Sequence, residues 1–184
     1  PRDLSPLLPE HQVDHVFLNK LTTFRQLKEL SRNRYDIFVN LCEGYPEWEV
    51  PGIDVVYSLE ALQLPFTGPT SQLYDVPKEL MKYVAYCEGV VTPPYKLIEK
   101  ESDLTELPPT LTFPLFVKPA HAGDSLGVND DSLVHDGRAL ENKCKSLLSQ
   151  YGSVLVENYI AGREFTVLVA ANTTPNTCTS FKPV

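Results

Sequence analysis

A lysine at the end of an apolar stretch is the residue of this chain best placed for chemistry on phosphate groups. Lys118 lies within FPLFVKPAHAGDSLG (113–127), where an apolar run ends and small residues follow. An ammonium group at a strand end supplies a point charge for phosphate oxygens. Gly123 and Gly127 allow close approach of the backbone to a ligand, and Ser125 adds a hydrogen-bond donor. Taken alone, such a segment is more typical of a β-hairpin with a solvated lysine.

A second segment carries groups suited to the remainder of a nucleotide. VLVENYIAGREFTV (154–167) holds two carboxylates, Glu157 and Glu164, on either side of a short apolar connection. Carboxylates accept hydrogen bonds from an exocyclic amine or from ribose hydroxyls. Tyr159 and Ile160 are apolar neighbours that could enclose the ring. Alone, this segment is more typical of a hairpin whose acidic side chains face water.

Together the two segments resemble the D-alanine–D-alanine ligase branch of the ATP-grasp superfamily. Proteins of this family carry phrases of the form FPxxVKPxxxGSSxG and VLxExxxxGxEFTV, which residues 113–127 and 154–167 match. LPFTG (64–68) matches the family's LPYTG turn, while Lys78 and Lys82 match its DK pair and a later lysine. The resemblance covers most of the chain, with the motifs in the family's order.

The resemblance implies a phosphate site and a loop that covers it. Lys78 and Lys118 are expected to contact the phosphates of ATP. Asp124, Ser125 and Gly127 are expected to belong to the loop that closes over them, with Ser125 as its catalytic residue. As an unpaired strand-end charge, Lys118 is expected to contribute little to folding.

The resemblance also implies an adenosine site and a reaction. Glu157 and the backbone of Ile160 are expected to hold the adenine edge, Tyr159 to pack on the ring and Glu164 to bind the ribose. Such enzymes use ATP and Mg²⁺ to activate a carboxylate as an acylphosphate, which an amine then attacks. The reaction depends on positioning and charge neutralisation. The expected substrate is an amino acid or another small carboxylate.

The departures from the family pattern lie mainly on the substrate side. LCEG (41–44) replaces the family's LHG segment, residues 45–49 replace GEDG, and Pro77 replaces the aspartate of DK. Asp124 replaces a serine, and its charge is expected to weaken use of D-alanine, since like charges repel. Two alternatives remain open: an ATP-grasp ligase with a different amino-acid or carboxylate substrate, and a nucleotide-binding pseudoenzyme.

Both ends of the sequence indicate a fragment. The chain starts at Pro1, and it stops at Val184 before the position of the family's magnesium ligands. We therefore expect no metal ligand among these residues, and we expect the fragment alone to be inactive. The chain has 184 residues and a net charge of −8, which argues against a nucleic-acid partner. No apolar run has the ~20 residues of a membrane helix.

The four cysteines lack the spacing of a zinc site or a disulfide framework, so we expect free, buried or half-buried thiols in a cytoplasmic protein. A homodimer is a further expectation. The patterns predict an α/β fold: a truncated pre-ATP-grasp (Rossmann-like) domain over 1–67, lacking its first strand, then an incomplete ATP-grasp domain over 68–184. The predicted strands are 15–18, 35–41, 95–98, 115–118, 126–129, 153–157 and 164–170. The predicted helices are 23–33, 55–62, 76–88 and 137–149.

Overall fold

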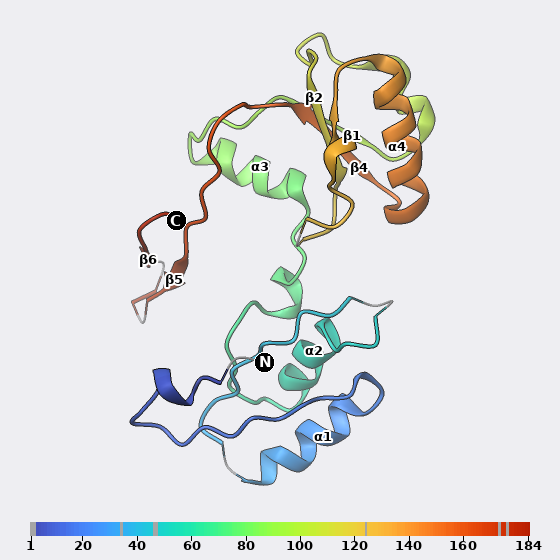
Figure 1. Ribbon diagram of the computed structural model, residues 1–184. Coiled ribbons are helices and arrows are strands. Elements are labelled where there is room, and N and C mark those ends of the chain that lie inside the picture. The colour runs from blue at the N-terminus through green and yellow to red at the C-terminus, as the bar shows by residue number, and fades with distance from the viewer. Residues whose placement is uncertain (1–2, 34, 46–47, 124, 173, 176) are drawn as a thin grey trace. The chain divides into compact units, whose positions relative to one another are not determined.

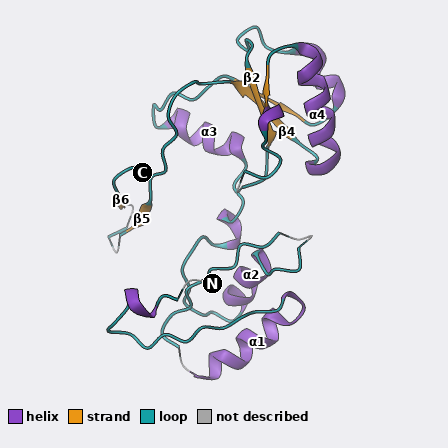
Figure 2. Cartoon of the chain, viewed as in Figure 1, coloured by secondary structure: helices purple, strands orange, loops and turns teal. Residues whose placement is uncertain are grey.

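The computed structural model divides into two compact units, Pro1–Leu80 and Met81–Val184. It describes residues 3–33, 35–45, 48–123, 125–172, 174–175 and 177–184. The named strands all lie in the second unit, whereas helices occur in both (Figures 1 and 2). The domain boundary proposed after residue 67 concerns family domains and stays a prediction.

The second unit is built on a four-stranded sheet in the order β1-β4-β2-β3. Every neighbouring pair in this sheet is antiparallel, so the second unit is mixed α/β and the strands of its sheet are not joined by parallel crossovers. The predictions of strands at 95–98, 115–118 and 153–157 are confirmed. The strands are β1 Tyr95–Ile98, β2 Leu115–Pro119, β3 Leu133–Val134 and β4 Val154–Asn158.

One face of this sheet packs against α4, Gly137–Tyr151 (Figure 1). The helix begins where the Asp136 carboxylate accepts the Ala139 N–H at 2.8 Å, and it ends at Gly152, whose φ of 73° suits glycine. Its apolar stripe recurs at helical spacing and is buried. The core formed with the sheet consists of Ile98, Leu115, Val117, Val134, Leu140, Cys144, Leu147, Val154 and Val156.

Two predicted strands of the second unit differ in the structure. Residues 126–129 form turns, in which Leu126 N–H donates to Gly123 O and Val128 N–H donates to Ser125 O. Of the predicted strand 164–170, only the end forms one, because β5 begins at Val169. Before it, Thr166 and Val184 exchange two backbone hydrogen bonds and Phe181 N–H donates to Leu168 O. The remaining elements are α3 Lys78–Cys87, 3-10 turns Glu101–Glu106 and Asp130–Ser132, and the hairpin β5 Val169–Ala171 with β6 Cys178–Ser180.

The first unit has two helices and extended chain between them. Its helices are α1 Thr23–Leu30 and α2 Ile53–Ala61, and its 3-10 turns are Ser5–Leu7, Lys20–Thr22, Ser31–Asn33 and Ser71–Leu73. Leu27 of α1 packs against Val55 and Leu59 of α2, and all three side chains are buried. This small core holds the extended segments that flank it.

The predicted strands at 15–18 and 35–41 are wrong for this structure. Within the described residues, the first lies in no strand, and the second has a single parallel bridge from Phe38 to Phe66. Both are apolar enough for strands, but in the described residues neither lies beside a segment that pairs with it along its length. A Rossmann-like sheet over 1–67 is therefore not established. Within the described residues, no helix has the length and apolar character required to cross a membrane.

Candidate functional site

The strand register brings charged and aromatic side chains together on the sheet face opposite the core. Glu157 of β4 lies directly across from Phe116 of β2 and from Tyr95 of β1. Directly opposed residues share a face, and residues two apart on one strand do so too. Lys118 therefore lies on the same face as Phe116. The intervening Val117 points the other way, into the core.

Glu157 pairs with two lysines from different parts of the second unit. The Lys118 ammonium donates to Glu157 Oε1. Lys82, on α3, lies 2.7 Å from Glu157 Oε2. The side chains of Glu157 and Lys82 are 10% exposed and that of Lys118 is 23% exposed. Each carboxylate oxygen thus has its own cation, and the cluster carries one net positive charge.

The two cations determine the ionisation of Glu157. Burial alone raises the pKa of a carboxyl group, because the charged form loses its hydration. Hydrogen bonds and charge attraction from Lys118 and Lys82 outweigh this, so the pKa of Glu157 lies below its ordinary value. Glu157 is therefore an anion at neutral pH, and the site keeps its excess cation.

Lys82 is the site residue that the sequence interpretation left out. Its ammonium also donates to Pro93 O at 3.2 Å and lies 5.0 Å from the centre of the Tyr95 ring. The available signal was the match of Lys82 to the family's later lysine, four residues after Lys78. That spacing puts the two lysines about one helical turn apart.

The expectation that Lys118 is unpaired is wrong. Its ammonium is held by Glu157 and lies 5.9 Å from the Phe116 ring centre. Removing one partner of a largely buried ion pair is destabilising, because the other charge is left poorly hydrated and without its counter-charge. Removing Lys118 should therefore lower the free energy of unfolding as well as weaken the binding of a ligand at this site.

An aromatic surface continues from this cluster. The rings of Phe116 and Tyr159 are stacked, with centroids 6.4 Å apart and planes at 28°. The side chain of Tyr159 is 42% exposed and that of Ile160 is 68% exposed. Tyr159 N–H donates to Pro114 O at 3.2 Å, which fixes the chain just beyond β4. A planar ring can therefore lie on apolar groups beside two ammonium groups.

The loop after β2 contains a residue other than glycine with a positive φ, Ser125, and a closely packed glycine, Gly127. Ser125 is exposed and has a φ of 57°, which is unusual for a residue other than glycine. Gly127 has a φ of 71°, and a Cβ there would lie 2.7 Å from Pro119 and 3.0 Å from Tyr151. Close packing and positive φ thus explain the glycine, so its type alone does not indicate a ligand.

Several predicted site residues are not joined to this cluster by any described contact. Glu164 is exposed on the chain between β4 and β5. Lys78 is the first residue of α3 and belongs to the first unit. Asp124 lies outside the described residues. Their roles, like those of Ser125 and Gly127, stay predictions.

The donor set suits a nucleotide better than a metal ion. Ammonium groups beside an aromatic surface match phosphates and a base. Among the residues that the structure describes, no group of three or more His, Cys, Asp or Glu side chains could hold a metal. The expectation that magnesium ligands lie beyond Val184 stays a prediction.

Solved structures that resemble this one place the fold among the ATP-grasp ligases. The D-alanine–D-alanine ligase of Helicobacter pylori superposes with a TM-score of 0.58 at 26% identity, over 71% of this chain and 39% of that protein. The chain belongs to the D-alanine–D-alanine ligase family, because the family model "D-ala D-ala ligase C-terminus" matches residues 86–183.

Relatives of known sequence agree with this assignment. A D-alanine–D-alanine ligase of Bordetella petrii is 32% identical over 79% of this chain and 43% of its own length. An uncharacterised protein of Sinorhizobium fredii is 32% identical over 86% of this chain and 46% of its own length. The chain thus spans less than half the length of these relatives. The comparisons favour neither the pseudoenzyme nor a ligase of different substrate.

Proposed function

We propose that the protein containing this chain is an ATP-dependent carboxylate–amine ligase of the D-alanine–D-alanine ligase type. The observation that carries the proposal is the cluster of Lys118, Glu157 and Lys82 beside the Phe116 and Tyr159 rings. Family membership supplies the reaction class: amide formation with ATP and Mg²⁺ through an acylphosphate. The family's known dependence on ATP and Mg²⁺ supports these cofactors.

The lysines are the groups proposed to bind phosphate. Lys118 is held at the end of a buried strand by Glu157, so its ammonium loses little freedom when a ligand arrives. Lys82 is held from α3 by the same carboxylate. An incoming phosphate shares these two cations with Glu157, while the remaining carboxylate lone pairs accept from the adenine amine.

The other proposed contacts complete the nucleotide site. Tyr159 packs on the base and the backbone of Ile160 bonds its edge, and Glu164 takes the ribose hydroxyls. The loop of residues 124–127 is proposed to cover the phosphates and to exclude water that would hydrolyse the activated carboxylate. Lys78 reaches the phosphates from the start of α3.

The substrate side is proposed to differ in detail from enzymes that use D-alanine. Residues 1–67 are proposed to form the pre-ATP-grasp domain, with LCEG (41–44) at the substrate. Replacing Asp124 by serine should raise D-alanine turnover, because it removes a negative charge near a substrate carboxylate. Release of ADP from the full-length protein, screened against amino acids and dipeptides, identifies the substrate.

The decisive experiment is ATP binding by the full-length protein, measured by isothermal titration. Lys118→Ala should weaken ATP at least about tenfold, equivalent to roughly 1.4 kcal/mol. Lys145→Ala is the matched control, because Lys145 is an exposed lysine of the same unit that pairs with the exposed Glu101 and Glu141. Agreement of wild type and Lys118→Ala within twofold would show that Lys118 is not a phosphate ligand.

A second measurement separates binding from folding. The melting temperature of Lys118→Ala without nucleotide should fall, since Glu157 loses one of its two cations. Lys118→Arg keeps that charge and should retain the melting temperature more fully than the alanine variant. If affinity falls only in variants that also lose stability, the effect is structural and the phosphate role is wrong.

A further inference from the structure

Lys143 is a buried cation of α4 that the proposed nucleotide contacts do not use. It is 9% exposed, and none of the ion pairs among the described residues includes it. A buried ammonium group costs free energy unless it is hydrogen-bonded. Helix α4 packs on the core face of the sheet with Val117, whereas Lys118 lies on the other face. Lys143 is therefore separated from the proposed phosphate ligands by the sheet.

The Lys143 ammonium is hydrogen-bonded to the chain that follows the loop after β2. It donates to Asn129 Oδ1 at 2.7 Å. The backbone of Asn129 is held as well, since its N–H donates to Ser132 Oγ at 3.0 Å and its carbonyl oxygen accepts the Ser132 N–H at 2.9 Å. Ser132 is fully buried. The hydrogen bond from Lys143 thus joins α4 to a chain position that is fixed on both sides.

The same side of α4 holds the end of the loop two residues earlier. A Cβ on Gly127 would lie 3.0 Å from the Tyr151 ring and 3.1 Å from Leu147, so the backbone packs directly on these side chains. Residues 143, 147 and 151 are four apart, about one helical turn, and form one row along the helix. Leu147 and Tyr151 hold the loop end by packing, and Lys143 holds it by a hydrogen bond.

The chain held by this row continues from the segment proposed to cover the phosphates. Leu126 N–H donates to Gly123 O and Val128 N–H donates to Ser125 O, both at 3.0 Å. These two turns connect Gly123 and Ser125 to the anchored end of the loop. Ordering a loop when a ligand binds costs free energy, so a loop that is already held binds more tightly. An anchor at residues 127–129 therefore favours binding at the loop.

We propose that Lys143 is a positioning residue of the ATP site, which it serves by holding Asn129 and so the end of the loop after β2. This inference rests on the proposed ATP-dependent function, and Lys143 itself contacts neither nucleotide nor substrate. A charged donor forms a stronger hydrogen bond than a neutral one. The ammonium thus explains why a lysine occupies a buried position of α4.

Amide hydrogen exchange in the full-length protein tests the anchor without nucleotide. Lys143→Met keeps a long side chain but removes the ammonium group. The amides of Leu126 and Val128 should exchange at least about tenfold faster in this variant, while those of β4 keep their rates. Equal exchange of Leu126 and Val128 in wild type and variant would overturn the proposal. Faster exchange throughout β4 would also reject it, because the effect would then be a general loss of stability.

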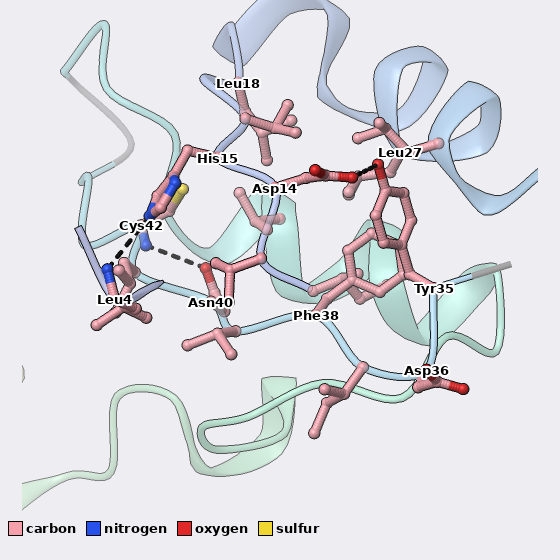
Figure 3. A pocket seen from close by; sticks show the side chains of 18 of the residues that line it. Leu4, Asp14, His15, Leu18, Leu27, Tyr35, Asp36, Phe38, Asn40 and Cys42 are labelled. Carbon is pink, nitrogen blue, oxygen red and sulfur yellow. Dashed lines mark hydrogen bonds between the residues drawn. The ribbon is translucent and has the colours of Figure 1, made fainter. Parts of the chain in front are cut away.

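Two control variants show whether the loop responds to this hydrogen bond in particular. Lys145→Met removes an exposed lysine of the same helix. Tyr35→Phe removes a hydrogen bond in the first unit, where the Tyr35 hydroxyl donates to Asp14 Oδ2 at 2.9 Å (Figure 3). Neither control should change the exchange of Leu126 and Val128. A change as large as that in Lys143→Met would contradict a specific anchor.

Nucleotide binding by the full-length protein tests whether the anchor serves the phosphate site. In isothermal titration, Lys143→Met should weaken ATP at least about fivefold, but adenosine, which has no phosphate, by less than about twofold. Equal weakening of both ligands, or of neither, would reject the positioning role. Failure of the wild type to bind ATP would reject the proposed function itself, and the wild-type titration alone reveals it.

Substitutions of Asn129 test whether the hydrogen bond carries the effect. Asn129 is exposed, so its replacement should leave the fold intact. Asn129→Leu should weaken ATP as much as Lys143→Met, and the double variant should be no weaker than either, because both changes remove one bond. Lys143→Arg keeps a charged donor and should bind ATP more tightly than Lys143→Met. Effects that multiply in the double variant would mean that the two residues act separately, against the proposal.

Discussion

The two units contain similar apolar segments that end in different structures. In the second unit, β4 is paired along both edges, with β1 on one side and β2 on the other, and its residues from Val154 to Val156 are fully buried. In the first unit, the described residues of 35–41 form one backbone bridge, at Phe38, and Ile37 and Val39 are about half exposed. An apolar pattern therefore indicates a capacity for strand formation, and the available partner decides the outcome.

The two units should also contribute unequally to the free energy of unfolding. The second unit combines a full ladder, a helix-covered face and an internally neutralised carboxylate. The first unit relies on a small core between α1 and α2. Mutations in the second unit should consequently have the larger effects, and the following tests take them from the largest to the smallest.

Cavity creation should show the greatest contrast between the units. Leu115→Ala removes a fully buried side chain from β2 and should cost about 4 kcal/mol of unfolding free energy. Ile37→Ala, at a predicted strand position of the first unit that is 53% exposed, should cost less than about 1 kcal/mol in the 184-residue chain. Urea titration of both variants measures the difference. Similar costs would mean that residues 35–41 are packed as tightly as β2.

Removing the charge of Glu157 should be the next largest effect. Glu157→Gln leaves two poorly hydrated ammonium groups without their anion and should cost about 3 kcal/mol. Glu141→Gln is the control, because Glu141 forms an exposed helical pair with Lys145 and exposed pairs contribute little. If the two variants unfold at the same urea concentration, the buried cluster does not stabilise the sheet.

The same carboxylate should make stability depend on pH in the acid range. The folded pKa of Glu157 lies below its ordinary value of 4.5, so its contribution is complete above pH 4.5. It is lost as the pH falls through the folded pKa, because protonation then costs the two ion pairs. The stability difference between wild type and Glu157→Gln should narrow below pH 4.5 in urea titrations. A constant difference from pH 7 to pH 3 would contradict this assignment.

Thiol labelling should distinguish the buried cysteine from the exposed ones by the rate of modification, with no substitution that changes the free energy of unfolding. Cys144 is buried beneath the sheet, and burial raises its pKa to about 12. Cys87 and Cys178 are exposed, contrary to the expectation that all four thiols are at least half-buried. Iodoacetamide at pH 8 should modify these two at least about tenfold faster than Cys144, since the thiolate is the nucleophile. Equal rates, read by mass spectrometry, would show that the core opens readily.

The spacing of apolar residues predicted those helices and strands whose formation depends on that spacing. The helix 137–149 and the strands 95–98 and 115–118 follow from apolar periodicity and are found nearly at those bounds. Lys118 and Glu157 were identified from their motifs, but their pairing required the strand register. The contact of Lys82 with Glu157 joins α3 to β4, and no spacing in the sequence indicates a contact between elements so far apart.

Gly127 limits how the loop over the proposed phosphate site can evolve. A larger residue there needs both a left-handed backbone and room that Pro119, Leu147 and Tyr151 already fill. Gly162, by comparison, has open space where a Cβ would lie. Gly127 is therefore a fixed point at the end of the loop after β2. A homologue without this glycine should carry a smaller residue in place of Tyr151 or Leu147, so the two changes should be inherited together.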